Sequence, residues 1–297
     1  MKRKYIFSTG AIGIIFMMIG QLSFAINDTL VKEIVIDNTS NLSVINVIFL
    51  RGLLSTSFIF IYLKFYEKKN ILNIFKIKNY HKRGIYEVLT AICFFTGLIL
   101  LPVAEVYTLL MTNPFFVTIF AFLFLKEKVG IRRWVAVAIG FVGVIFVVSP
   151  QNISFNFLYI FPIIAAIFLT IRDITTKGIA TKSNSFEIIF ITSVLMTLFS
   201  GIGSLFFDFT FKIEYLSNLF ISSLFLTIAY VFSVLTIFYA PLSLTASSRY
   251  SVIVFGMLFG YLVLNEIPSI NMIIGAAIIS LSGLFVINRE KKLGKIK

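Results

Sequence analysis

The sequence is poor in the residues that build metal and nucleophilic sites, with one cysteine and one histidine among 297 residues. Cys93 alone cannot form an internal disulfide or a cysteine-based metal cluster. His81 lies in a basic segment, and with no second histidine zinc or triad chemistry is not expected. The phosphate-binding patterns GxxxxGKS and GxxxxGKT are also absent from the sequence. We therefore expect no enzyme, no cofactor and no metal.

Charge is scarce as well. Only 13% of the residues are charged, whereas 59% are apolar and the mean hydropathy is +0.99. A soluble domain has about 25% charged and about 45–50% apolar residues. A globule of this size could not hide so many apolar side chains from water, which excludes a soluble single domain and a disordered chain.

Long charge-free runs are abundant, and each is close to the roughly 20 residues that cross a bilayer as a helix. Two runs are too long for one helix and are expected to break at 149–152 and at Pro241. The result is an all-α membrane protein with ten transmembrane helices. The predicted spans are 5–27, 38–62, 84–101, 106–125, two within 134–171, 188–207, two within 215–264, and 267–288.

The basic residues are distributed unevenly between the predicted loops. With the N-terminus in the cytoplasm, 22 of the 26 lysines and arginines fall in cytoplasmic segments. This asymmetry matches the positive-inside rule and predicts a multi-pass inner-membrane protein with both termini cytoplasmic. Anionic lipid, rather than nucleic acid, then accounts for the net charge of +13.

The two halves of the chain resemble each other. With an offset of 139 residues, 102–147 and 241–286 are identical at eleven of 46 positions, including Pro102 with Pro241 and Glu127 with Glu266. We therefore predict one repeat over 1–150 (helices one to five) and a second over 151–297 (helices six to ten). Because five is odd, the halves must insert with opposite orientation, which is the inverted-repeat architecture of many secondary transporters.

Several short motifs keep the order and spacing of a known family. They are Phe24-Ala-Ile-Asn-Asp-Thr-Leu-Val-Lys32, Phe49-Leu-Arg51, Leu101-Pro-Val-Ala-Glu-Val, Asn113-Pro114, Leu125-Lys-Glu127, Ala240-Pro241 and Leu264-Asn-Glu266. With these motifs the whole chain resembles the EamA-type transporters of the drug/metabolite transporter superfamily.

The resemblance implies ten helices in two inverted halves and the passage of a small metabolite by alternating access. It does not define the solute, because similar members include exporters of amino acids and importers of riboflavin or S-adenosylmethionine. It also implies a place for Asn113 in the central site. The second half departs from this pattern, because Val252-Ile253 stands where Asn113-Pro114 would repeat.

Two arginines lie within predicted spans, where an ionisable group is costly unless it is paired or hydrated. Arg51 is about ten residues from either surface, so it is expected either to bind a carboxylate or phosphate in a central cavity or to form a structural ion pair. Arg249 is nearer the cytoplasmic surface and could extend towards it. Arg249 and the adjacent Tyr250 are further cavity candidates.

Acidic residues near the helix ends allow two interpretations. Asp28 lies four residues before Lys32, which favours a local pair, and the alternative places Asn27 and Asp28 on the transport pathway. Arg172 and Asp173 are adjacent on a helix, so their side chains should diverge by about 100° and not pair with each other. Glu87 should pair with Arg83, four residues before it.

The remaining candidates are weaker. Tyr107 and Tyr230 combine an aromatic face with a hydroxyl and suit a cavity for amphipathic solutes, or simple packing. Glu127 and Glu266 are expected to stabilise the N-termini of the helices that follow them. Gly256 and Gly260 have the GxxxG spacing, which is compatible with a homodimer.

The predicted function is a secondary transporter of a small organic metabolite. Arg51, Asn27, Asp28, Tyr107, Asn113, Tyr230, Arg249 and Tyr250 are its substrate-binding candidates. The alternative is a structural or regulatory membrane subunit. The two arginines within spans argue against that alternative, because a purely structural bundle gains little from such costly groups. The expected partners are a small-molecule substrate and the lipid bilayer.

Overall fold

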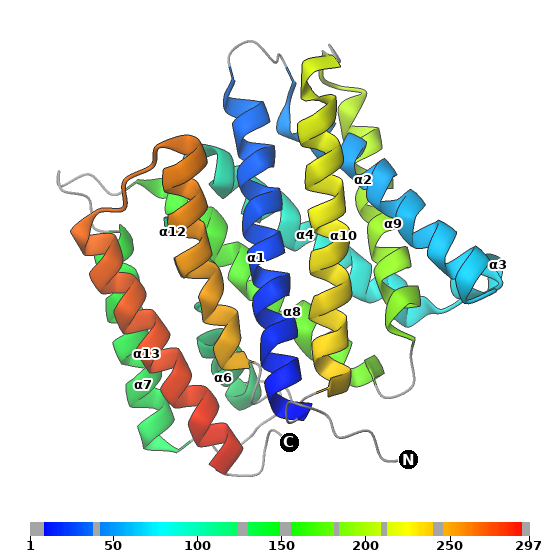
Figure 1. Cartoon of the computed structure of the whole chain (residues 1–297). Helices are drawn as coiled ribbons and strands as arrows, with labels where there is room; N and C mark the ends of the chain where they lie inside the picture. The colour runs from blue at the N-terminus through cyan, green and yellow to red at the C-terminus, as the bar shows by residue number, and fades with distance from the viewer. Residues whose placement is uncertain are drawn as a thin grey trace.

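The computed structural model describes residues 9–37, 42–123, 130–148, 156–180, 184–208, 213–239 and 246–292, and this part of the chain is helical (Figure 1). Its main helices are α1 (Thr9–Ile36), α2 (Val44–Ile61), α3 (Ile71–Ile74), α4 (Lys78–Leu100), α5 (Val103–Leu110), α6 (Asn113–Leu123), α7 (Ile131–Val148), α8 (Ile160–Ala180), α9 (Ser185–Ser204), α10 (Leu216–Tyr239), α12 (Ser251–Leu264) and α13 (Ile270–Lys292). Short 3-10 helices cover Phe157–Tyr159, Ile213–Tyr215 and Ala246–Tyr250, and a π-helical turn covers Tyr62–Tyr66.

Seven segments of the described chain are long and apolar enough to cross a membrane, and three shorter apolar helices accompany them. The shorter ones are Trp134–Val148, Ser248–Leu264 and Ile270–Val286. The all-helical membrane architecture is thus confirmed, whereas the count of ten spans and the inverted repeat stay predictions. The predicted breaks at 149–152 and at Pro241, together with Glu127, lie outside the described residues.

The first helix is longer than predicted. It was expected to end at Asn27, but α1 continues to Ile36. Asp28 and Lys32 therefore lie within the helix, one and five residues after its expected end. Their charges are tolerated because both side chains find partners on other parts of the chain, as described below.

The fourth predicted span is interrupted, which the sequence interpretation of one continuous helix over 106–125 missed. The chain leaves α5 at Met111 and re-enters a helix at Asn113. Pro114 supplies the physical reason, since proline has no N–H to donate and fits the first turn of a new helix. The hydroxyl of Thr112 donates to the carbonyl of Leu109 at 2.7 Å and so satisfies a group that the break exposes.

The most extensive helix contacts join the first half of the chain to the second. They are α1 with α10, α7 with α13, α4 with α8, and α2 with α9. The α7–α13 contact is so close that a Cβ on Gly275 would lie 2.7 Å from the carbonyl oxygen of Gly143. In Figure 1, α1 begins and α13 ends at the same end of the bundle, and α1 lies between α10 and α12.

Candidate functional site

A cavity of about 430 Å³ lies inside the bundle, within the usual size range of small-molecule sites. Side chains from α1, α2, α4, α5, α8, α9, α10 and the start of α12 line it. Its charged lining residues are Asp28, Arg51, Arg83, Glu87, Arg172, Asp173 and Arg249. Both halves of the chain thus contribute charge to one internal space.

Asp28 and Arg51 form the deeper of two polar groups in this cavity. The Asp28 carboxylate accepts hydrogen bonds from the amide of Asn27 at 2.7 Å and from the hydroxyl of Tyr107 at 2.7 Å. Arg51 Nη1 donates to Asn27 Oδ1 at 2.9 Å and lies 3.8 Å from Asp28 Oδ1. Ser222 of α10 also donates to Asn27 Oδ1, at 2.8 Å.

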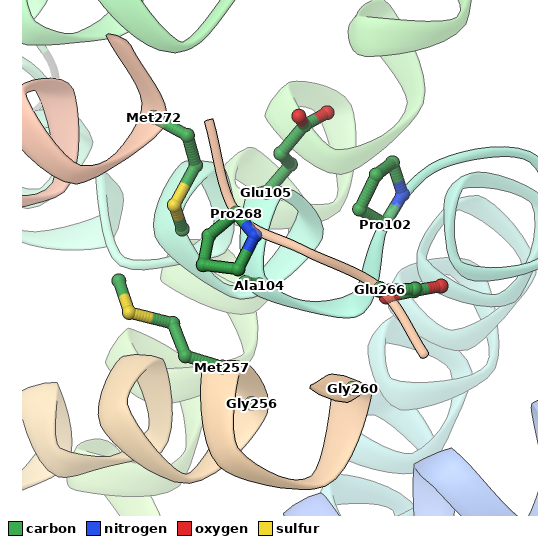
Figure 2. Close-up of a pocket in the computed structure, with 9 residues that line it drawn as sticks. All are labelled: Pro102, Ala104, Glu105, Gly256, Met257, Gly260, Glu266, Pro268 and Met272. Carbon is green, nitrogen blue, oxygen red and sulfur yellow. The ribbon is translucent and has the colours of Figure 1, made fainter. Parts of the chain in front are cut away.

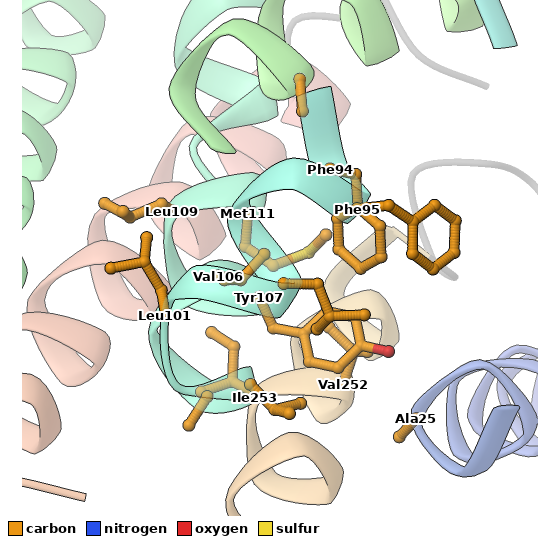
Figure 3. Close-up of a cluster of buried hydrophobic side chains, with 14 of the residues drawn as sticks. Ala25, Phe94, Phe95, Leu101, Val106, Tyr107, Leu109, Met111, Val252 and Ile253 are labelled. Carbon is orange, nitrogen blue, oxygen red and sulfur yellow. The ribbon is translucent and has the colours of Figure 1, made fainter. Parts of the chain in front are cut away.

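Tyr107 reaches Asp28 because α12 leaves room for its ring. A Cβ on Gly256 would lie 2.5 Å from Tyr107 Cδ2, so a glycine is required beside the ring. In Figure 3 the ring lies over α12 near Val252, and its hydroxyl points towards α1, the helix that carries Ala25. The packing of α5 on α12 therefore aims a hydroxyl at the carboxylate.

A second polar group, which we call the arginine network, comprises Arg83, Glu87, Arg172, Asp173 and Arg249. Glu87 accepts from Arg172 at 3.0 Å and pairs with Arg83 at 2.9 Å. Asp173 accepts from Arg172 at 2.8 Å and from Arg249 at 2.9 Å. Charges on α4, α8 and the 3-10 helix before α12 are thereby connected.

Solvent exposure is lower in the Asp28–Arg51 group than in the arginine network. The side chain of Arg51 is 4% exposed, whereas those of Arg172 and Arg249 are 16% and 27% exposed. The cavity is thus more accessible at the end near Arg249 than beside Arg51.

The opposite end of the bundle is held by a group that we call the Lys32 clasp: Lys32, Glu266, the carbonyl of Leu101 and the amide of Val103. Lys32 Nζ lies 2.5 Å from both Glu266 Oε1 and Leu101 O, and Glu266 Oε2 accepts from the Val103 N–H at 2.7 Å. The clasp satisfies the carbonyl of Leu101, directly after α4, and the first N–H of α5, which has no partner within its helix.

Small residues allow the clasp to close. A Cβ on Gly260 would lie 3.1 Å from Glu266 Oε2. Figure 2 shows Pro102 and Glu266 next to one another, with Gly256 and Gly260 on the α12 surface below them. Both glycines thus face α5 and the clasp within this chain, so their spacing carries no argument for the homodimer, which stays a prediction.

Five of the eight predicted site residues line the cavity: Asp28, Arg51, Tyr107, Tyr230 and Arg249. Asn27 lies behind this lining, fully buried, and orients Arg51. Asn113 is 3.5 Å from Asp173 and lies behind the arginine network. Tyr250 is buried against Gly283 and is not among the described lining residues.

Three pairing predictions need correction. Asp28 and Lys32 do not pair with each other, because each finds a closer partner on another element. Arg172 and Asp173 do pair, at 2.8 Å, because the long arginine side chain bends back across the 100° between adjacent residues. Glu266 stabilises the N-terminus of α5, not that of α13, because the chain folds back over α5 before α13 begins.

The predicted pair of Arg83 with Glu87 is confirmed at 2.9 Å. Sequence reasoning missed that this pair belongs to the cavity and extends through Arg172 to Asp173. It also missed Phe95, whose ring lies 4.6 Å from the Arg51 guanidinium carbon. Spacing along the chain signals the first pair alone, since the others depend on how helices pack.

Comparison with known proteins identifies a matching family and several similar transporters. Residues 11–149 match the EamA-like transporter family. The S-adenosylmethionine uptake transporter of Rickettsia bellii is 26% identical over 289 residues, which cover 96% of each chain. The pseudopaline exporter CntI of Pseudomonas aeruginosa is 23% identical over 94% of this chain and 97% of its own.

Two further matches cover either part of the sequence or the fold. The riboflavin transporter of Vibrio cholerae is 33% identical over 99 residues, a third of each chain. A solved protein structure shares the fold with a TM-score of 0.59 at 15% identity, covering 92% of this chain and 98% of that one.

Several segments able to span a membrane and a charged internal cavity are the features of a multi-pass membrane protein with an internal polar site. Residues 11–149 thus match the EamA-like transporter family, and the similar proteins that align along nearly the whole chain are transporters.

Proposed function

We propose that this protein is a secondary transporter that moves a small organic metabolite across the inner membrane by alternating access. The observation that carries this proposal is the 430 Å³ cavity, whose charged lining comes from both halves of the chain. Isolated charges within a membrane are costly, so a chain that gathers seven of them around one space uses that space for a polar solute.

The helix contacts support two equivalent repeats over 1–150 and 151–297, and the five helices predicted for each would make the repeats inverted. If α1 corresponds to α8 and α4 to α10, exchanging the halves converts the α1–α10 contact into the α8–α4 contact, and both are extensive. The α2–α9, α7–α13 and α5–α12 contacts each convert into themselves. The family match over residues 11–149 coincides with the first proposed repeat.

The distribution of basic residues supports cytoplasmic termini. In that orientation the Lys32 clasp lies on the outer side and Arg249 on the cytoplasmic side. We therefore propose that the structure is closed to the outside and that its cavity is reached from the cytoplasm. The rise in exposure from Arg51 to Arg249 supports an opening at the Arg249 end of the cavity.

The clasp is suited to be the outer gate. It joins α1 of the first half to the α12–α13 connection of the second through one ion pair, whose side chains are 6% and 19% exposed. An outward-open state would separate Lys32 from Glu266 and release the Leu101 and Val103 backbone groups to water. Because water can then satisfy all four groups, the cost of opening is limited.

Within the cavity, we propose that Arg51, Asp28, Tyr107, Tyr230 and Arg249 contact the solute. Asn27, Asn113 and Tyr250 would hold or shape this lining from behind. The similar proteins are named for S-adenosylmethionine, riboflavin and pseudopaline, so the solute is expected to be an organic molecule of comparable kind.

Transport in reconstituted vesicles tests the proposal. Proteoliposomes would be supplied with S-adenosylmethionine, riboflavin, pseudopaline and a set of amino acids, with uptake and efflux measured by mass spectrometry. We expect flux of at least one solute, its loss in Arg51→Ala, and partial recovery in Arg51→Lys, which keeps the charge but not the planar fork. Arg132→Gln, at the exposed start of α7, is the matched control and should transport normally.

Normal flux in a well-folded Arg51→Ala variant would show that Arg51 is not part of the solute site. Flux no greater than that of protein-free vesicles for every solute would favour the structural-subunit alternative.

A further inference from the structure

The hydrogen-bonding capacity left over in the cavity points to one class of ligand. The cavity holds three carboxylates, those of Asp28, Glu87 and Asp173, and each of their six oxygens already accepts a hydrogen bond or ion pair from the protein. A ligand cation would therefore have to share an oxygen that already has a partner. The three carboxylates hold no unpartnered oxygen.

Donor capacity, by contrast, is left over. Arg51 Nε is buried without a hydrogen-bond partner, and so is the hydroxyl of Ser233, another lining residue. Four arginines face the cavity against three carboxylates, which leaves a surplus of one positive charge. In both Arg83 and Arg172, all three guanidinium nitrogens contact partners within the protein. These two arginines therefore have no unpartnered nitrogen for a ligand.

Arg51 is the cavity arginine with a buried nitrogen that has no partner. Its 3.8 Å approach to Asp28 joins a single nitrogen to a single oxygen, unlike the short paired bonds of a full arginine–carboxylate contact. Phe95 covers the guanidinium plane at 4.6 Å, and Asn27 takes Nη1. Nε of a guanidinium that is 4% exposed is thus left unpaired in a residue that lines the cavity.

We infer that the cavity binds its solute through an anionic oxygen group, a carboxylate or a phosphate, placed at the Nε edge of Arg51. This inference rests on the proposed function and names the class of solute. Phe24, Phe94 and Phe95 add apolar surface to the same cavity, so the solute carries an organic body beside the anionic group. An amine without a carboxylate or phosphate finds no unpartnered carboxylate oxygen and binds more weakly.

Binding to purified, full-length protein in detergent tests this assignment without requiring transport. The probes are matched pairs in which only the anionic group changes: phenylalanine against phenylalanine amide, and 3-phenylpropionate against 3-phenylpropanamide. Phenyl phosphate distinguishes phosphate from carboxylate. The Kd of each probe follows from the ligand-dependent rise of the thermal midpoint, because a ligand that binds only the folded state stabilises it.

We expect each carboxylate to bind about ten- to hundred-fold more tightly than its amide, the usual range for a hydrogen bond to a charged group. Arg51→Gln should reduce that preference to less than about three-fold, while Arg132→Gln should retain it. Ser233→Ala, which removes the second unpaired donor, should lower carboxylate affinity by a few-fold.

Amides that bind as tightly as the acids would overturn the assignment, and so would an undiminished preference in Arg51→Gln. If Arg51→Gln does not fold, Arg51→Lys serves, and there the preference should fall to an intermediate value. An absence of binding by every acid and phosphate probe also counts against it. Vesicle flux of an amine that lacks an acid group would refute this inference while leaving the transporter function intact.

Discussion

The two ends of the bundle handle buried charge in different ways. At the Lys32 clasp, one ion pair is completed by two backbone groups, and all four groups are satisfied at 2.5 to 2.7 Å. At the arginine network, five charged side chains share their partners around the accessible part of the cavity. The clasp behaves as a single contact, whereas the network can lose one bond and keep the others.

This difference has a mechanistic consequence. A two-state gate needs a contact that is either made or broken, and a single ion pair with backbone partners meets that need. A solute pathway needs charges that stay paired while a solute passes, and a shared network meets it. The following variants test the contrast, from the largest expected effect to the smallest.

Lys32→Met should have the largest effect, because it leaves Glu266 buried without a cation. Breaking a buried ion pair costs about 3–5 kcal/mol, which should favour an outward-open state. In a Cys93→Ser background with Met111→Cys as the cavity reporter, labelling by an impermeant maleimide from outside should rise at least about ten-fold, the equivalent of about 1.4 kcal/mol.

The double variant Lys32→Met with Glu266→Gln provides the control. Removing both charges leaves no unpaired ion, so labelling should return part of the way towards the parent. Unchanged labelling in Lys32→Met would show that the clasp is not the gate.

Glu87→Gln should destabilise the protein more than Asp173→Asn does. Each carboxylate pairs with two arginines, but the Glu87 side chain is 11% exposed, whereas that of Asp173 is 24% exposed and therefore more screened. We expect losses of about 2–4 kcal/mol and about 1–2 kcal/mol, respectively, in the free energy of unfolding. Denaturation of the purified variants in detergent measures both, and the reverse order would contradict a network graded by burial.

Tyr107→Phe removes one hydrogen bond to Asp28 and keeps the ring beside Gly256. The expected loss is about 1–2 kcal/mol in the free energy of solute binding, because the Asp28 oxygen loses its donor in a buried site. It should appear as a several-fold weaker solute affinity in the binding assay. Gly256→Ala offers an independent check, since its Cβ would displace the ring, and an unaltered affinity in both variants would place Asp28 outside the site.

Arg249→Gln should have the smallest effect on stability, below about 1 kcal/mol. Its side chain is 27% exposed, and Asp173 keeps its bond to Arg172 when Arg249 is removed. Thermal unfolding of the purified variant measures the change. A loss as large as that of Glu87→Gln would mean that the cavity is closed at this end.

The sequence by itself determined the class of protein, most span positions and the residues worth suspecting. Apolar runs of membrane length are local properties, and the bilayer selects helices from them with little reference to the rest of the chain. The same locality identified Arg51 as costly within its span and Arg83 as the partner of Glu87, four residues away.

Only the tertiary structure decided which charges meet. Lys32 pairs with a carboxylate 234 residues away, and Tyr107 reaches Asp28 across 79 residues. Spacing rules relate residues three or four positions apart, so they assigned Asp28 to Lys32 and separated Arg172 from Asp173. The physical reason is that a charge in a low-dielectric interior takes whatever partner the packed helices bring nearest, and that packing depends on the whole chain.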